Sequence, residues 1–85
     1  ALHLFGGDRP YRCRLLGGPP ESPAYQRVVP GGCVFGATLI EPGGYALVGC
    51  TLAPGFDPDD WETVGRREML ARYPDPHDLI VHLTP

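Results

Sequence analysis

The sequence has no lysine and only one serine, and both shortages narrow the chemistry that it can support. Lysine and arginine together number seven, and all seven are arginine. Without lysine, the chain cannot form a Schiff base through a side-chain amine or supply the lysine of a phosphate-binding loop. Ser22 lies in a Pro-Pro-Glu-Ser-Pro stretch that reads as a turn, so a serine hydrolase is excluded.

The chain also lacks an excess of positive charge and any long apolar run. Its formal net charge of −3 gives no electrostatic reason to expect nucleic acid or an anionic membrane as a partner. No apolar run approaches the roughly 20 residues of a transmembrane helix, and no secretory signal is visible. The cysteines form no C-x-x-C pair, which favours small buried side chains in a reduced, cytoplasmic protein. They are Cys13, Cys33 and Cys50.

Glycine and proline, by contrast, are plentiful, at 12 and 11 of the 85 residues. They separate short apolar runs, which is typical of the turns of an antiparallel sheet. The fold class predicted is therefore mainly β, an antiparallel β-sandwich. Its strands are expected at residues 2–5, 11–16, 24–29, 33–40 and 45–52, the last two forming a hairpin.

After residue 56 the pattern changes from strand to helix. Residues 65–73 predict a short helix that Pro74 ends, and the Asp-Pro pair that opens residues 75–84 is typical of a second helix start. We expect one domain over residues 1–85, with a β part over 1–56 and a helical tail over 57–85. Phe56 and Trp61 are expected to anchor the helices outside the sheet.

Residues 48–57 read Val-Gly-Cys-Thr-Leu-Ala-Pro-Gly-Phe-Asp. This run resembles a small branch of the cupin superfamily whose members carry V-G-C-T-x-A-P-G-F-[DE] followed by two short helices. The resemblance implies a jelly roll with a central pocket. In the metal-dependent members of the superfamily, it also implies His and Glu ligands for Fe, Mn, Ni or Zn.

This chain is similar to the two cupin sequence motifs only in part. Pro30 and Gly32 match the P-x-G of the second motif, but Phe35 stands where its metal-binding His would be. The first motif maps only by its last glycine, at Gly7, which would put its ligands before Ala1. The resemblance therefore implies the C-terminal portion of a cupin, an incomplete jelly roll, with no metal and no cofactor bound by this chain.

The resemblance places Phe35 inward, and side chains two apart on a strand share a face. This predicts an apolar ligand pocket, with His3 on the opposite, outer face. The alternative is that the same side chains fill the core of a small barrel. The predicted pocket residues are Leu2, Leu4, Cys33, Phe35, Ala37 and Tyr45.

Three arginines are candidates for contact with an anionic group of a ligand, because a guanidinium can bind a carboxylate or phosphate as a planar fork. They are Arg12, Arg14 and Arg27. The alternative is that arginines at alternate positions of a strand are simply solvated.

Two functions fit these observations. The first is a small-molecule-binding cupin-like protein. The likeness of this branch to deoxysugar epimerase-like cupins implies a metal-independent isomerase, epimerase or cyclase acting on a sugar-like or other small metabolite, with Tyr45 as a candidate acid. The alternative is a non-catalytic half-barrel that forms a homodimer or joins a partner chain to complete the fold, since exposed sheet edges are usually paired or covered.

Overall fold

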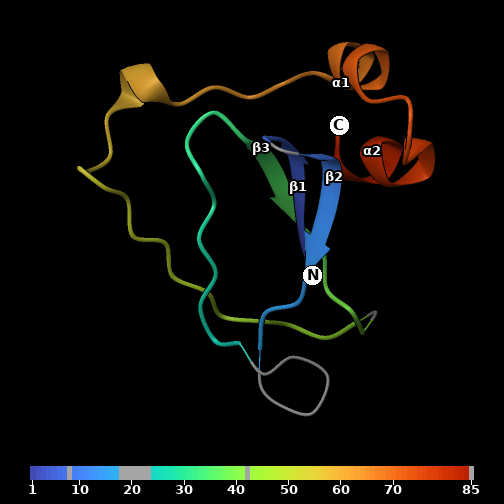
Figure 1. Ribbon diagram of the computed structural model, residues 1–85. Helices are drawn as coiled ribbons and strands as arrows, with labels where there is room; N and C mark the ends of the chain where they lie inside the picture. Colours follow the sequence, from blue (N-terminus) through green and yellow to red (C-terminus); the bar gives the residue numbers. More distant parts are fainter. Residues whose placement is uncertain (8, 18–23, 42, 85) are drawn as a thin grey trace.

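The structure is a computed structural model that describes residues 1–7, 9–17, 24–41 and 43–84. Three strands come first along the chain, and a short 3-10 helix and two α-helices follow (Figure 1). The elements are β1 (Leu2–Gly6), β2 (Arg9–Arg14), β3 (Val34–Ala37), η1 (Pro58–Asp60), α1 (Arg66–Arg72) and α2 (His77–Leu83).

The three strands form one antiparallel sheet in the order β2-β1-β3, with β1 at its centre. The connection from β1 to β2 is tight because Gly6 and Gly7 both adopt positive φ angles, +99° and +78°, which glycine reaches without steric cost. The antiparallel sheet and the two C-terminal helices are as predicted. A sandwich or closed jelly roll is not present in the described residues.

Cross-strand partners in an antiparallel sheet project from the same face, so the register sorts the side chains into two sets. Phe5 is the partner of Tyr11 on β2 and of Val34 on β3. Leu4 is the partner of Arg12 and of Phe35, and it projects from the opposite face. We call these the helix-covered face and the Phe35 face.

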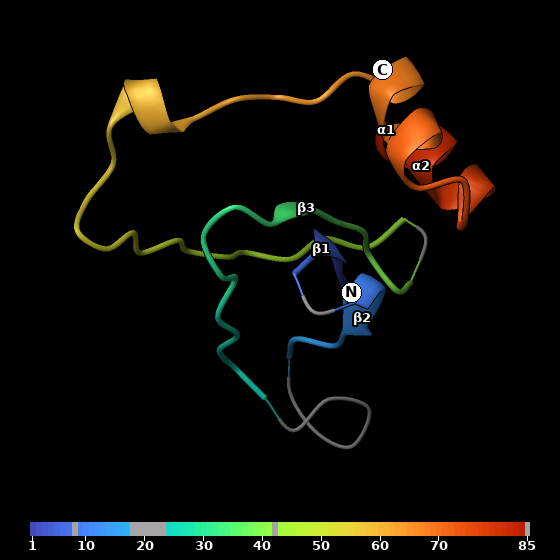
Figure 2. The ribbon, with the colours of Figure 1, turned by 45° about the horizontal axis from the view of Figure 1, so that its top comes forward.

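The helices α1 and α2 pack on the helix-covered face, where they form the core (Figure 2). Phe5, Met69 and Ile80 are its buried residues, 2%, 4% and 1% exposed. Tyr11 and Val34 of the sheet, with Tyr73 and Leu83 of the tail, are packed against them among other half-buried side chains. Each helix has only seven residues, too few for independent stability, so this apolar contact stabilises them.

Gly36 allows β3 and α2 to approach closely. A Cβ atom at this position would lie 3.3 Å from both terminal methyl carbons of Leu83. Because that distance is shorter than an ordinary van der Waals contact, glycine lets the end of α2 rest directly on the strand.

Two of the predicted strands are wrong. Residues 24–29 and 45–52 adopt no strand in the structure, and the predicted strand over 33–40 is reduced to Val34–Ala37. A strand needs a neighbour that satisfies its backbone N–H and C=O groups. Within the described residues the sheet ends at β3, so no strand pairs with either segment.

Two expectations about burial are also corrected. Phe56 and Trp61 do not anchor the helices, because each is 65% exposed, and η1 stands away from the sheet in both ribbon views (Figures 1 and 2). Cys13 and Cys50 are exposed and Cys33 is half-buried, and all three are free thiols. The helical tail contacts the sheet through the apolar stripes of its two helices, and these contacts are sufficient to dock the helices on the sheet.

In the part of the chain that the structure describes, no helix is both long enough and apolar enough to cross a bilayer.

Candidate functional site

Four of the six predicted pocket residues lie together on the Phe35 face. Leu2 is the partner of Ala37, and Leu4 is the partner of Phe35, so the register brings all four side chains to one side of β1 and β3. Leu4 is only 3% exposed, whereas the ring of Phe35 is 55% exposed. The group is therefore a patch with a buried centre and an accessible edge.

Cys33 directly precedes β3 and adjoins this patch. Its thiol donates a hydrogen bond to the carbonyl oxygen of Phe5 at 3.2 Å, and a guanidinium nitrogen of Arg12 lies 3.9 Å from its sulfur. Arg12 is the cross-strand partner of Leu4, so the guanidinium reaches Cys33 across the same face. One thiol and one cation thus border the apolar patch.

The three candidate arginines differ in their surroundings. Arg12 is half-buried beside Cys33, and Arg14, the partner of Leu2, is exposed on the same face. The guanidinium of Arg14 donates to the carbonyl oxygen of Cys13 at 3.3 Å. Arg27 donates to the carbonyl oxygen of Leu15 at 2.9 Å and lies outside the sheet. Of the three, Arg12 is the one that combines partial burial with contact to the predicted pocket.

Tyr45 is not brought to this patch. It is 95% exposed and belongs to the segment that forms no strand, so the face-sharing argument does not apply to it. Its exposed phenol lacks the burial that is common at catalytic groups.

His3, by contrast, forms a hydrogen-bonded cluster that the sequence analysis missed. It is 6% exposed on the helix-covered face, and both of its ring nitrogens have partners. Nδ1 lies 2.9 Å from the hydroxyl of Tyr11, and Nε2 lies 2.8 Å from the hydroxyl of Thr38. The cluster links β1 to β2 and to the residue that follows β3.

The surroundings of His3 keep its imidazole neutral at pH 7. Burial lowers the pKa of His3 below its usual 6.5, and the positive charge of the Ala1 amino group lowers it further. Burial also raises the pKa of Tyr11 above its usual 10.0, with smaller contributions from the charge of Cys13 and a hydrogen bond with it. A neutral imidazole has one donor and one acceptor nitrogen, which suits two hydroxyl partners.

A signal for this cluster was present in the sequence. His3 was expected on the face opposite Leu2 and Leu4, and the register confirms that placement. The expectation that this face is the outer, solvated one is wrong. Phe5 shares the face with His3, and the apolar stripe of the second helix needed a surface to cover. Together these two facts predict a buried histidine.

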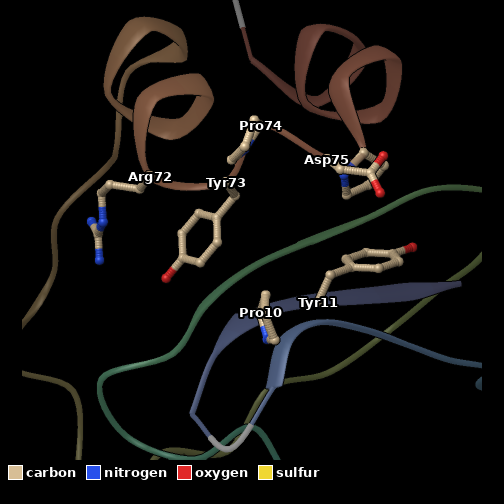
Figure 3. A pocket seen from close by; sticks show the side chains of 7 residues that line it. Pro10, Tyr11, Arg72, Tyr73, Pro74 and Asp75 are labelled. Carbon is tan, nitrogen blue, oxygen red and sulfur yellow. The ribbon is translucent and has the colours of Figure 1, made fainter.

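An open groove lies between β2 and the end of α1 (Figure 3). Pro10 and Tyr11 form one side, and Tyr73 and the connection over residues 74–76 form the other. Arg72 and Asp75 lie at its two ends. Tyr11 therefore belongs both to the groove wall and to the hydrogen-bonded cluster of His3.

The described residues do not fit the single metal ion of metal-dependent cupins. Among them, no three His, Cys, Asp or Glu side chains converge on one point. Phe35, which has no lone pair, stands at the position where the second cupin motif has a histidine. His3 uses both ring nitrogens in hydrogen bonds, so it offers none to a metal.

Comparison with known proteins gives one match. Residues 1–64 match the family described as Cupin superfamily (DUF985), a stretch that contains all three strands and ends before α1. No curated protein and no solved structure matches the chain. Since the family match covers more than half of the 85 residues, this chain belongs to the Cupin superfamily (DUF985).

Proposed function

We propose that this chain is a small-molecule-binding cupin and that its ligand lies on the Phe35 face. One observation carries the proposal: the register gathers Leu2, Leu4 and Phe35 beside the guanidinium of Arg12. An apolar surface with a few well-placed polar groups at its border is the usual composition of a ligand site.

The ligand that suits this surface combines a ring with one anionic group. The accessible ring of Phe35 offers stacking area, and the positive charge of the half-buried Arg12 favours a phosphate or carboxylate beside it. A sugar phosphate or a similar small metabolite has both features. Metal-independent isomerase, epimerase or cyclase chemistry would need an acid and a base near such a ligand. In the described residues, the register brings no histidine or carboxylate to this face. We therefore propose that the face binds a ligand, and the proposal does not extend to catalysis.

Titration with glucose 6-phosphate, followed by the backbone amide signals in NMR, tests this proposal. Signals of Val34–Ala37 and Arg12 should shift saturably, and glucose without the phosphate should bind at least about tenfold more weakly. Phe35→Ser and Arg12→Gln should each weaken binding, while Arg67→Gln, on the exposed side of α1, should not. Equal loss in all three variants, or shifts that do not saturate, would contradict a site on this face.

A second function is favoured by a different observation, which is the exposed apolar segment between β3 and η1. Leu39, Ile40, Tyr45, Leu47 and Val48 are between 49% and 97% exposed. Monomeric proteins rarely expose a long run of large apolar side chains, and such runs mark contacts with other chains. We propose that this segment pairs with a second copy or with a completing chain to build the missing sheet.

Light scattering over a range of protein concentrations tests the assembly proposal. The mass should exceed that of one chain, and Leu47→Asp should return it to the monomer because the charge would enter the contact. Thr63→Asp adds the same charge outside the apolar segment and serves as the matched control. A monomer at every concentration would contradict pairing with a second copy and leave the completing chain as the partner. Dissociation by both variants alike would contradict a contact through the apolar segment.

A further inference from the structure

We infer that the groove between β2 and the α1–α2 connection is a second binding site, on the side of the sheet opposite the Phe35 face, for a ring compound that carries an acid and a hydroxyl. The inference does not depend on the proposed function, because the groove shares no residue with the Phe35 face.

The walls of the groove suit a flat or cyclic ligand. Tyr11 and Tyr73 contribute rings from opposite sides, and both rings pack on Phe5, with centroids 5.2 and 5.5 Å from its own. Prolines make up most of the remaining wall. Because the tyrosines are held by the core and the prolines have restricted backbones, little conformational entropy is lost when a ligand enters.

Arg72 marks the acid-binding end. Its guanidinium lies over the ring of Tyr73, 5.5 Å from the ring centroid, and one of its nitrogens lies 3.5 Å from a carboxylate oxygen of Glu68. Both members of that ion pair are largely exposed, so the pair is weak. The ring orients the guanidinium, and its remaining N–H donors can receive the acid group of a ligand.

Asp75 marks the other end. It is exposed, and the described residues show no hydrogen bond or ion pair for its carboxylate, which is free to accept a hydrogen bond. A carboxylate opposite an arginine selects a ligand with a donor at one end and an acid at the other. A ring hydroxyl is such a donor, and it leaves the ligand an overall acid.

Two sources share this chemistry, an aromatic hydroxy acid and a sugar acid. The probes are therefore 4-hydroxybenzoate and glucuronate, each titrated into the isotope-labelled chain and followed by NMR. For ligands this small, a dissociation constant on the order of 1 mM is expected. Saturable shifts should gather at the amides of Tyr11, Arg72, Tyr73 and Asp75. The probe that binds more tightly identifies the source.

Single substitutions at exposed positions test both ends of the groove. Arg72→Gln should weaken binding about tenfold. Glu68→Gln should tighten it, because the competing carboxylate is gone. Asp75→Asn should remove the advantage of 4-hydroxybenzoate over benzoate. Arg67→Gln is the matched control on α1 and should change nothing.

The inference would be overturned by the absence of saturable shifts with both probes, by equal effects of Arg67→Gln and Arg72→Gln, or by tighter binding of benzylamine than of benzoate. Shifts that gather at Arg12 and Val34–Ala37 instead would also overturn it, while supporting the separate proposal for the Phe35 face.

Discussion

The Nδ1 atom of His3 lies 2.9 Å from the hydroxyl of Tyr11, and this bond ties the central strand to β2 inside the helix-covered face. Their rings also stack, with an interplanar angle of 14° and a centroid distance of 6.1 Å. Thr38 completes the cluster from the other side of β1. A buried histidine thus hydrogen-bonds to a segment on each side of the central strand.

Tyr11→Phe should therefore destabilise the fold more than the loss of one exposed hydroxyl would. It leaves a ring nitrogen of His3 buried without its partner, which costs about 1–3 kcal/mol. The melting temperature should fall by roughly 4–8 °C for each kcal/mol. Tyr25→Phe removes the hydroxyl of a residue that is 74% exposed and should change stability by less than about 0.5 kcal/mol. Equal melting temperatures for the two variants would contradict a structural role for the bond.

Stability should fall on mild acidification because of His3. Its pKa in the folded chain is below the usual 6.5, so the unfolded state takes up the proton first. The contribution of the neutral imidazole is complete above pH 6.5. It is lost as the pH falls from 6.5 through the lower pKa of the folded state. Urea unfolding at several pH values measures this slope. His3→Gln should flatten this slope below pH 6.5. An unchanged slope in this variant would contradict the role of His3.

The sequence was sufficient to predict two kinds of element. In one, the pairing partner is close along the chain, and in the other, the pattern does not depend on another segment. β1 and β2 are joined by a glycine turn and alternate clearly, and Pro74 marks the end of α1, so their positions were predicted to within a few residues. Residues 45–52 have an equally good strand pattern but no strand beside them in the described chain. The sequence pattern of a segment shows that it is able to form a strand. It does not show whether a neighbouring strand is present to pair with it.

The candidate site shows the same limit. Period-two alternation grouped Leu2 with Leu4 and Phe35 with Ala37, because alternation along a strand is a local property. The cupin resemblance placed both pairs on one face, and the register agrees. It did not reveal the burial of His3, whose partners Tyr11 and Thr38 are 8 and 35 residues away. The groove was also beyond prediction, since its two walls come from β2 and from the α1–α2 connection.

Gly36→Ala should destabilise the chain through Leu83. The new methyl group would lie 3.3 Å from both terminal carbons of Leu83, and that side chain is itself packed on the core. Overpacking of this kind costs about 1–3 kcal/mol. In a Leu83→Ala background the same change should be neutral or slightly stabilising, because alanine is better than glycine within a strand. Chemical unfolding of the four proteins of this cycle measures the coupling; purely additive effects would mean that α2 does not rest on β3.

Arg66 should hold the two helices together at the C-terminal end of α2. Its guanidinium donates to the carbonyl oxygens of Val81 and Thr84 at 2.9 and 2.7 Å, and to the hydroxyl of Thr84 at 3.0 Å. These carbonyls belong to the last turn of α2 and to the residue after it, where a helix leaves them without internal partners and a cation is favoured.

Arg66→Ala should consequently destabilise the tail by about 0.5–1.5 kcal/mol, the lower end reflecting the exposure of this site. Hydrogen exchange of the α2 amides, which reports local opening, should quicken more than that of the β1 amides. Thr84→Ala removes the hydroxyl that accepts from Arg66 and that donates to the carbonyl oxygen of Ile80 at 2.6 Å. It leaves both carbonyl contacts of Arg66 in place and should have a smaller effect. Arg67→Ala, at the next position of α1 and without a hydrogen bond in the described residues, is the control. Comparable exchange in Arg66→Ala and Arg67→Ala would show that the apolar contacts of Met69 and Ile80 hold the helices in place without the guanidinium.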